Sequence, residues 1–208
     1  MTQGQVYPQI VLEAEGLAVG RGETVLARDL RFHVASGGGL MLRGPNGAGK
    51  STLLLTLAGL LPPLAGTVAQ KGIDPEDGPP MHHAGHSNAI RARLTVRDTL
   101  SFWAGVNGPT GLEPGAALDR VGLGRAAGLD AGYLSAGQQR RLALARLLVS
   151  RRPVWLLDEP SAALDAEGEA LLAALLTEHL AEGGLAIIAT HDRREFDEFA
   201  TLQLGGPA

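Results

Sequence analysis

The sequence predicts an α/β domain built on a mostly parallel sheet with helices on both faces. Apolar strand-like runs alternate with helical patterns along most of the chain, which is the order of elements that builds such a sheet. A glycine-rich loop joins a short apolar run to a helix, and a later apolar run ends in two acidic residues. Both features belong at the carboxyl edge of a parallel sheet.

The first third of the chain is predicted to be mainly strand. Two long β patterns are separated by a turn at Gly20 and Gly22, and a second glycine turn precedes a short apolar run that leads into the glycine-rich loop. An apolar helix follows and stops before Pro62. The predicted elements are strands at residues 10–19, 24–34, 40–43 and 67–71 and a helix at residues 49–59.

The middle of the chain, roughly residues 85–150, is predicted to be a mainly helical subdomain inserted in the sheet domain. Thr95, with Asp98 three residues later, is typical of a helix N-cap, and this helix should run to about residue 106 with Phe102 and Trp103 in the core. Weakly helical pieces broken by glycines come next. A clear helix is then expected at residues 136–150, with its apolar face formed by Leu142, Ala145, Leu148 and Val149.

The last third returns to alternating strands and helices. Residues 154–157 and 185–189 are continuous apolar runs, as expected for strands buried on both faces. A helix at residues 166–181 lies between them, and residues 201–204 are expected to be an edge strand.

Composition excludes several classes of protein. A length of 208 residues with 45% hydrophobic residues suits one domain with a small inserted subdomain. The absence of cysteine rules out disulfides and thiolate metal sites. A net charge of −4 argues against a general nucleic-acid-binding surface. The most apolar stretch, residues 53–61, is too short to span a bilayer, so other chains must cross the membrane if the protein serves a membrane process.

The glycine-rich loop fits the phosphate-binding pattern G-x-x-x-x-G-K-[ST]. Its glycines allow a tight curl in which several backbone N–H groups point at one anion. Lys50, one of only two lysines, would place a positive charge on the outer phosphates, and Ser51 would offer a hydroxyl to Mg²⁺. The residues predicted to bind ATP here are Gly44, Pro45, Asn46, Gly47, Ala48, Gly49, Lys50, Ser51 and Thr52.

Acidic residues and a histidine follow two of the buried strands. Asp158 ends the strand at 154–157 and is expected near Mg²⁺, while Glu159 could orient or deprotonate an attacking water. His191 follows the strand at 185–189, at the same predicted edge, and is expected to contact the γ-phosphate. A strand that ends in a solvated acidic turn is the simpler alternative for the acidic pair.

A second anion site is predicted at the start of the helix at 136–150. Ser135 is a good N-cap, and Gly137 leaves backbone N–H groups open. This turn cannot share the γ-phosphate of the loop within one subunit unless the chain folds back on itself, which favours a dimer. A plain capped helix is the alternative. Asp165 likewise either caps the helix that follows it or contacts a partner subunit.

These segments resemble the nucleotide-binding domain of ATP-binding-cassette (ABC) transporters over nearly the whole chain. The resemblance is carried, in order, by GPNGAGKST at 44–52, LSAGQQ at 134–139, VWLLDEP at 154–160, SAALD at 161–165 and His191. It implies a P-loop NTPase fold with a mostly parallel sheet, an antiparallel β part and an inserted helical subdomain. It also implies that residues 1–208 form a single nucleotide-binding domain.

The family resemblance implies specific roles at a head-to-tail homodimer. Each ATP would lie between the Lys50 loop of one subunit and the signature turn of the other. Glu159 would be the general base, His191 the γ-phosphate switch and Asp165 a contact across the dimer. The residues implied to contact ATP in trans are Ser135, Ala136, Gly137 and Gln138, with Ala136 in place of a glycine of the family's LSGGQ signature.

Residues 83–103 are similar to the ATPase subunit of the haem exporter of c-type cytochrome maturation. The pattern is HAGHSNAI at 83–90 followed by LTVRDTLSFW at 94–103. This similarity implies a peripheral ATPase at the cytoplasmic face of a bacterial inner membrane, with separate transmembrane permease subunits. Haem or a maturation intermediate would be handled by the complex. His82, His83 and His86 are expected in a strand and loop beside the nucleotide, at a subunit contact, and direct ligation of haem or metal by them is the alternative.

Besides Ala136, two positions depart from the family pattern. Ser87 takes the place of a glutamine that reaches Mg²⁺ and the transmembrane partner, and it is too short for both tasks, so water must bridge or the coupling must differ. Arg21 takes the place of an aromatic residue that stacks on adenine, and a guanidinium plane can also stack on a base.

Three other functions are compatible with the same motifs. The chain could serve a different ABC importer or exporter. It could be a soluble ABC ATPase acting on ribosomes or nucleic acid, although such proteins usually carry two cassettes or a long coiled-coil insertion. It could also be a nucleotide-dependent regulatory module with little turnover, against which the intact pair Asp158 and Glu159 argues.

Overall fold

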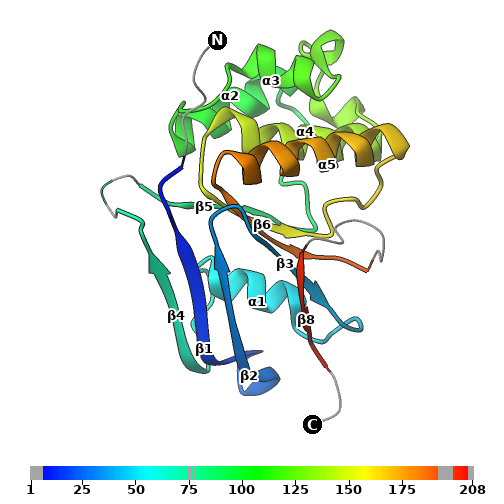
Figure 1. Ribbon diagram of the computed structural model, residues 1–208. Coiled ribbons are helices and arrows are strands. Elements are labelled where there is room, and N and C mark those ends of the chain that lie inside the picture. The colour runs from blue at the N-terminus through cyan, green and yellow to red at the C-terminus, as the bar shows by residue number, and fades with distance from the viewer. Residues whose placement is uncertain (1–6, 75, 77, 192–198, 206–208) are drawn as a thin grey trace. The chain divides into compact units, whose positions relative to one another are not determined.

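The computed structural model describes residues 7–74, 76, 78–191 and 199–205 (Figure 1). The described chain divides into two compact units. The first unit draws on Met1–Gly85, Pro153–Glu159 and Leu176–Ala208, and the second on His86–Arg152 and Pro160–Leu175. Among the described residues, the strands β1–β8 belong to the first unit, and the second unit is mainly helical.

An antiparallel sheet of three strands opens the first unit. Its order is β2-β1-β4, formed by Thr24–Ala35, Val11–Arg21 and Ala65–Lys71. The predicted strands are confirmed, but the prediction that Gly20 lies in the turn is wrong. Gly20 pairs with Val25 inside the ladder, and a side chain there would overlap the carbonyl oxygen of Thr24.

A five-stranded parallel sheet forms the other part of the first unit. Its order is β5-β6-β7-β3-β8, with strands at Met81–Ala84, Val154–Asp158, Leu185–Ala189, Gly39–Arg43 and Ala200–Gln203. Every residue of β6 and β7 is buried, as their continuous apolar runs predict. A strand at the histidines was expected but without bounds, and pairing with β6 defines it as Met81–Ala84.

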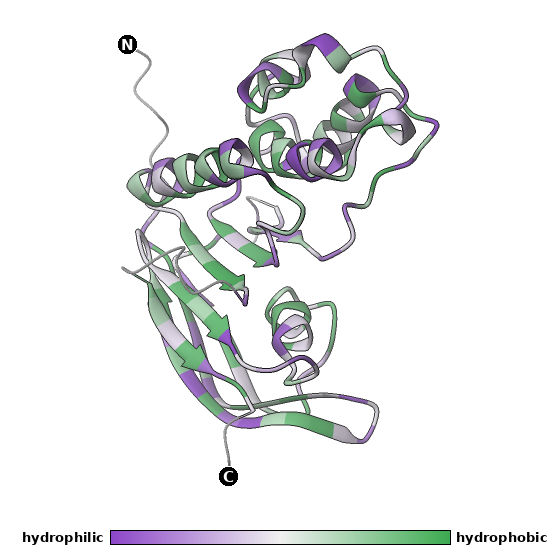
Figure 2. Ribbon diagram, turned by 90° about the vertical axis from the view of Figure 1, so that its right-hand side faces the viewer, coloured by the Kyte–Doolittle hydropathy of each residue, from purple (hydrophilic) through white to green (hydrophobic). Residues whose placement is uncertain are grey.

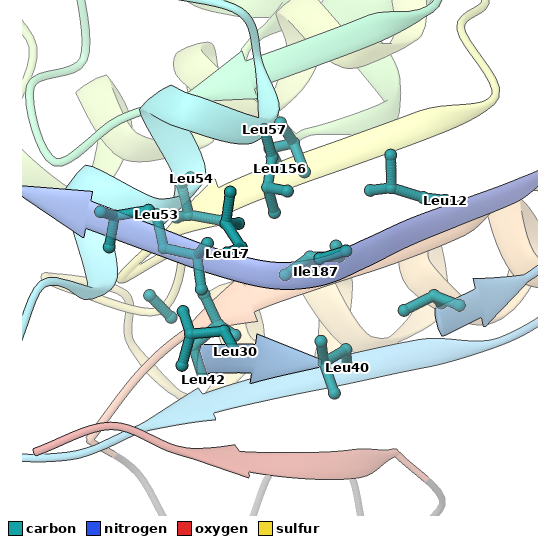
Figure 3. Close-up of a cluster of buried hydrophobic side chains, with 14 of the residues drawn as sticks. Leu12, Leu17, Leu30, Leu40, Leu42, Leu53, Leu54, Leu57, Leu156 and Ile187 are labelled. Carbon is teal, nitrogen blue, oxygen red and sulfur yellow. The ribbon is translucent and has the colours of Figure 1, made fainter. Parts of the chain in front are cut away.

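One hydrophobic core joins the two sheets and the helix α1 (Lys50–Leu57). Figure 3 shows leucines of α1, such as Leu53 and Leu57, beside Leu12 and Leu17 of β1 and Ile187 of β7. Six of the eight residues of α1 are buried, as expected for a helix enclosed on most sides. This packing fixes the start of α1, where the phosphate loop ends.

The strand β6 also packs on the end of the helix α5 (Ala166–Ala181), which was predicted with these bounds. The indole of Trp155 stacks on the imidazole of His179 with ring centroids 4.0 Å apart. Burial lowers the pKa of His179 to about 4, so the imidazole is neutral near pH 7. The uncharged ring packs against Trp155 of the strand.

The second unit packs helices around its own hydrophobic core. Its elements are α2 (Val96–Asn107), α3 (Pro114–Arg120), η2 (Gly124–Ala126), η3 (Ala131–Tyr133) and α4 (Ala136–Val149). The core includes Leu100, Leu118 and Leu142. Thr95 caps α2 by accepting a hydrogen bond from the N–H of Asp98, as predicted. In Figure 2 the helices show alternating hydrophobic and hydrophilic bands, as expected for helices with one buried face.

The prediction that Phe102 lies in this core is wrong. Phe102 is 43% exposed, because Val96, Leu100 and Ala104 form the buried stripe of α2 and Phe102 falls outside it. Trp103 is partly buried, and the guanidinium of Arg146 covers its ring at 3.7 Å.

Within the described residues, every helix is too short or too polar to cross a bilayer.

Candidate active site

The phosphate loop curls through backbone conformations that favour glycine. Gly44, Gly47 and Gly49 have φ angles of 145°, 82° and 97°. At Gly44 a side chain would also overlap the carbonyl oxygen of Leu204, so both conformation and space require glycine there. The curl ends where α1 begins, with the N–H of Leu53 donating to the oxygen of Gly49 at 2.7 Å. A glycine-rich curl followed directly by a helix N-terminus is the arrangement that binds phosphate groups.

The ammonium group of Lys50 lies inside this curl. Its Nζ donates to the carbonyl oxygens of Gly44 at 2.7 Å and Pro45 at 3.1 Å. Only 7% of Lys50 is exposed. The backbone of the loop thus holds a single buried cation beside the N–H groups that would bind phosphate.

The register of the parallel sheet explains how distant residues meet at this edge. Strand β7 lies between β3 and β6, and Ala189 pairs with both Leu42 and Asp158. The phosphate loop, the acidic pair and His191 therefore leave three adjacent strands at the same level. His191 Nε2 lies 3.5 Å from Lys50 Nζ and 3.4 Å from Glu159 Oε1. The structure thus brings the three predicted catalytic residues together.

Glu159 has a strained backbone. Its φ of 48° is left-handed, a conformation that costs a residue other than glycine on the order of 1 to 3 kcal/mol. Its N–H donates to the oxygen of Ala189 at 2.8 Å. Its side chain is 23% exposed, whereas Asp158 is buried. The strain turns the chain immediately after the buried strand and leaves the Glu159 carboxylate accessible.

The other residues predicted on this unit have mixed surroundings. Thr52 and Ala48 are buried, whereas Pro45 and Asn46 are exposed. Ser51, in the first turn of α1, is partly exposed. A serine hydroxyl and an aspartate carboxylate are oxygen donors of the kind that Mg²⁺ prefers, so Ser51 and Asp158 fit a magnesium site. Arg21 is the exposed last residue of β1, opposite Thr24.

In the second unit, the signature turn is a capped helix start. The Ser135 hydroxyl accepts from the Gln138 N–H at 3.3 Å, and the Gln138 side chain accepts from the Ser135 N–H at 2.9 Å. Ser135 is thus the N-cap, as predicted. Ala136 and Gly137 form the first turn of α4, where N–H groups have no acceptor within a helix.

Asp165 engages neighbours within the second unit. Its carboxylate accepts from the Gly168 N–H at 2.9 Å, which caps the start of α5, and pairs with Arg141 at 2.6 Å. The Gly168 N–H, and then the Arg141 guanidinium, hold the pKa of this carboxyl below its usual value. The structure therefore shows the helix-capping alternative for Asp165.

The segment after β5 contains a residue that the sequence did not single out. Ser87 is exposed, but its neighbour Asn88 is held by two arginines of α4. Arg140 donates to Asn88 Oδ1 at 3.0 Å, and Arg146 donates to the Asn88 carbonyl oxygen at 3.2 Å. One amide residue in a loop gives no sequence signal for these bonds.

The histidines near β5 alternate along the strand. His82 is buried and His83 is partly buried, as expected for neighbours on opposite faces of a sheet, and His86 is exposed in the second unit. In the part of the chain that the structure describes, no three His, Asp or Glu residues group as a metal site would require.

A glycine-rich loop around a buried lysine, beside an acidic pair at the edge of a parallel sheet, defines the class of P-loop nucleotide hydrolases. Comparison with known proteins gives the family. The family model described as ABC transporter matches residues 27–162. The chain belongs to the ABC transporter family: it binds ATP and hydrolyses it to drive transport together with membrane permease subunits.

Three similar proteins agree with this assignment. The cytochrome c biogenesis ATP-binding export protein CcmA of Rhizobium meliloti (strain 1021) is 45% identical over 207 residues, covering 94% of this chain and 98% of its own. A protein of the same name from Rhizobium johnstonii is 49% identical over 191 residues, covering 86% and 87%. A solved putative ABC transporter ATP-binding protein from Pyrococcus furiosus has a TM-score of 0.80 and 25% identity, covering 93% and 97%. The fold class predicted from sequence is confirmed.

Proposed function

We propose that this chain is the ATPase subunit of an exporter that acts in the biogenesis of c-type cytochromes. Two observations support this: relatives named for that task are 45% and 49% identical over most of both chains, and residues 83–103 carry the pattern described above. The ATPase would lie at the cytoplasmic face of the bacterial inner membrane. The membrane subunits would handle haem or a maturation intermediate, without direct contact with this chain.

Hydrolysis would depend mainly on positioned charge. Lys50 and the N–H groups of the loop would hold the phosphates and stabilise negative charge as it moves during phosphoryl transfer. Glu159 would take the proton of the attacking water, and His191 would contact the γ-phosphate. Ser51 and Asp158 would hold Mg²⁺, which neutralises charge on the phosphate oxygens.

A second copy of the chain would complete each site. The exposed turn Ser135–Gln138 of that copy would face the γ-phosphate, with Asp165 near the contact. Because Ser135 and Gln138 bond each other, the N–H groups of Ala136 and Gly137 are the expected donors.

The observation that carries the hydrolytic part of this proposal is the row Lys50, His191 and Glu159, with successive side-chain distances of 3.5 and 3.4 Å. Glu159→Gln keeps the shape of the side chain and removes the base. We expect ATP affinity to stay within about twofold while turnover falls roughly a hundredfold or more.

Phosphate release and nucleotide titration measure these two quantities. Glu23→Gln, in the exposed turn between β1 and β2, is the matched control and should leave both unchanged. Hydrolysis by Glu159→Gln at the normal rate would remove Glu159 from the proposed role.

The cellular part of the proposal has its own test. Disruption of this chain should abolish covalent haem attachment to c-type cytochromes, measured by haem staining, and the wild-type chain should restore it. Glu159→Gln should fail to restore it. Normal haem attachment in the disrupted strain would assign the chain to another ABC transporter.

A further inference from the structure

Arg140 of α4 contacts two segments that are far apart in the sequence. Its Nε donates to the carbonyl oxygen of Pro160 at 2.9 Å, and its Nη1 donates to Asn88 Oδ1 at 3.0 Å. The residue is only 3% exposed. A buried guanidinium that donates to two fixed acceptors orders both of them, because its donors form a rigid planar fork.

Both contacted residues adjoin a strained residue. Glu159, at φ 48°, directly precedes Pro160, and Ala89, at φ 50°, directly follows Asn88. Left-handed conformations at such residues persist only where the surrounding structure enforces them. On the far side, the Glu159 N–H is held by the Ala189 oxygen at 2.8 Å. The backbone of Glu159 is therefore fixed by one hydrogen bond at its own N–H and one at the next carbonyl.

We propose that Arg140 is a positioning residue for ATP hydrolysis. By holding the carbonyl of Pro160, the residue bonded directly to Glu159, it sets the left-handed backbone of Glu159. The inference rests on the proposed role of Glu159 as general base.

Arg146 provides a matched control on the same helix. It also reaches Asn88, through the carbonyl oxygen at 3.2 Å, and its guanidinium lies over the ring of Trp103. Burial lowers its pKa to about 10. Loss of either arginine removes a buried charge and a bond to Asn88, but only loss of Arg140 releases the hydrogen bond to Pro160.

The experiment compares Arg140→Met with Arg146→Met in the full-length chain, purified with the membrane subunits that co-purify with it. Both variants should lower the midpoint of thermal unfolding. Only Arg140→Met should lower kcat, by about tenfold or more, because a small displacement of a catalytic group is costly. Its KM for ATP should stay within about twofold, since the Lys50 loop is unchanged. Arg140→Lys should recover part of kcat, because an ammonium group can reach one acceptor but does not reproduce the fork.

Equal losses of kcat in the two methionine variants, or a normal kcat in Arg140→Met, would overturn the inference. If Arg140→Met does not fold, Arg140→Lys is the variant that tests the inference. A wild-type kcat in Arg140→Lys then overturns the inference. Asn88→Ala leaves the Pro160 bond in place and should change kcat less than Arg140→Lys does. An inactive Glu159→Gln with a fully active Arg140→Met refutes this inference alone, whereas an active Glu159→Gln refutes the proposed role of Glu159.

Discussion

The phosphate loop of the first unit and the signature turn of the second both present backbone N–H groups, but they are built in different ways. The loop has three glycines with positive φ, and Gly44 leaves no space for a side chain. The turn uses an ordinary extended N-cap, Ser135, with φ −61° and ψ 162°. The loop therefore depends on a conformation that few sequences adopt, and the turn depends on a cap that several residues can supply.

This difference explains why one departure from the family pattern is compatible with the local backbone. Ala136 replaces a signature glycine, but it begins the helix α4, and any L-residue adopts a helical conformation. Gly137 is less tolerant, because an added Cβ would lie 3.0 Å from the carbonyl oxygen of Ala163. The two neighbouring positions thus differ in available space, which their shared place in the signature does not reveal.

The two cationic side chains beside the loop and the turn, Lys50 and Arg141, also differ in what balances their charge. Lys50 is buried, and its ammonium group donates to the carbonyl oxygens of Gly44 and Pro45. Arg141, beside the signature turn, pairs with Asp165 at 2.6 Å and Glu167 at 3.3 Å. A cation held by neutral oxygens keeps its charge available for an anion, whereas the charge of Arg141 is already balanced.

The largest expected effect tests the buried cation. Lys50→Ala removes a charge-assisted contact to the phosphates, so ATP affinity should fall roughly ten- to a hundredfold. Lys71→Ala is the control: it removes the only other lysine, which forms an exposed pair with Glu13, and should leave affinity unchanged. Titration with ATP measures both. Normal affinity in Lys50→Ala would show that the N–H groups alone bind the phosphates.

The sequence predicted the loop and the buried strands well because their signals are local. A glycine pattern around Lys50 specifies its own conformation, and the apolar run of β7 gave bounds of 185–189 that the structure repeats. The order of β3, β7 and β6 places the sequence-distant groups of the site at one edge, and the general rule for parallel sheets was enough to predict this.

The sequence did not predict features that depend on long-range packing. The bounds of strand β5 are set by its pairing with β6, and Phe102 is exposed because the buried stripe of α2 lies elsewhere. The bond between Arg140 and Asn88 joins residues 52 positions apart, and neither residue carries a motif that names the other. Side-chain pairings of this kind are set by the folded arrangement, so single-sequence patterns do not report them.

A smaller effect tests the cap of the signature turn. Ser135→Ala removes the acceptor of the Gln138 N–H and should destabilise the fold by about 1 kcal/mol. For a chain of this length, that lowers the midpoint of thermal unfolding by roughly 2 to 4 °C. Ser135→Asp retains a capping oxygen and should unfold at the wild-type temperature. Equal midpoints for all three proteins would show that the cap contributes nothing to stability.

The smallest expected effect concerns Asp165 and its dependence on pH. The native pKa lies below the ordinary value of 3.8, first because of the Gly168 N–H and then because of Arg141. The native state therefore binds this proton less tightly than the unfolded chain does. The resulting stabilisation is present above pH 3.8 and is lost as the pH falls through the lower native value.

Asp165→Asn keeps a side-chain oxygen that can cap α5 and removes only the charge. Its unfolding midpoint should be slightly below that of the wild type at pH 7, and the gap should close as the pH falls below 3.8. Because the carboxylate is exposed, added salt should also narrow the gap. A gap that stays constant from pH 7 to about pH 3 would assign the effect to the cap rather than the charge.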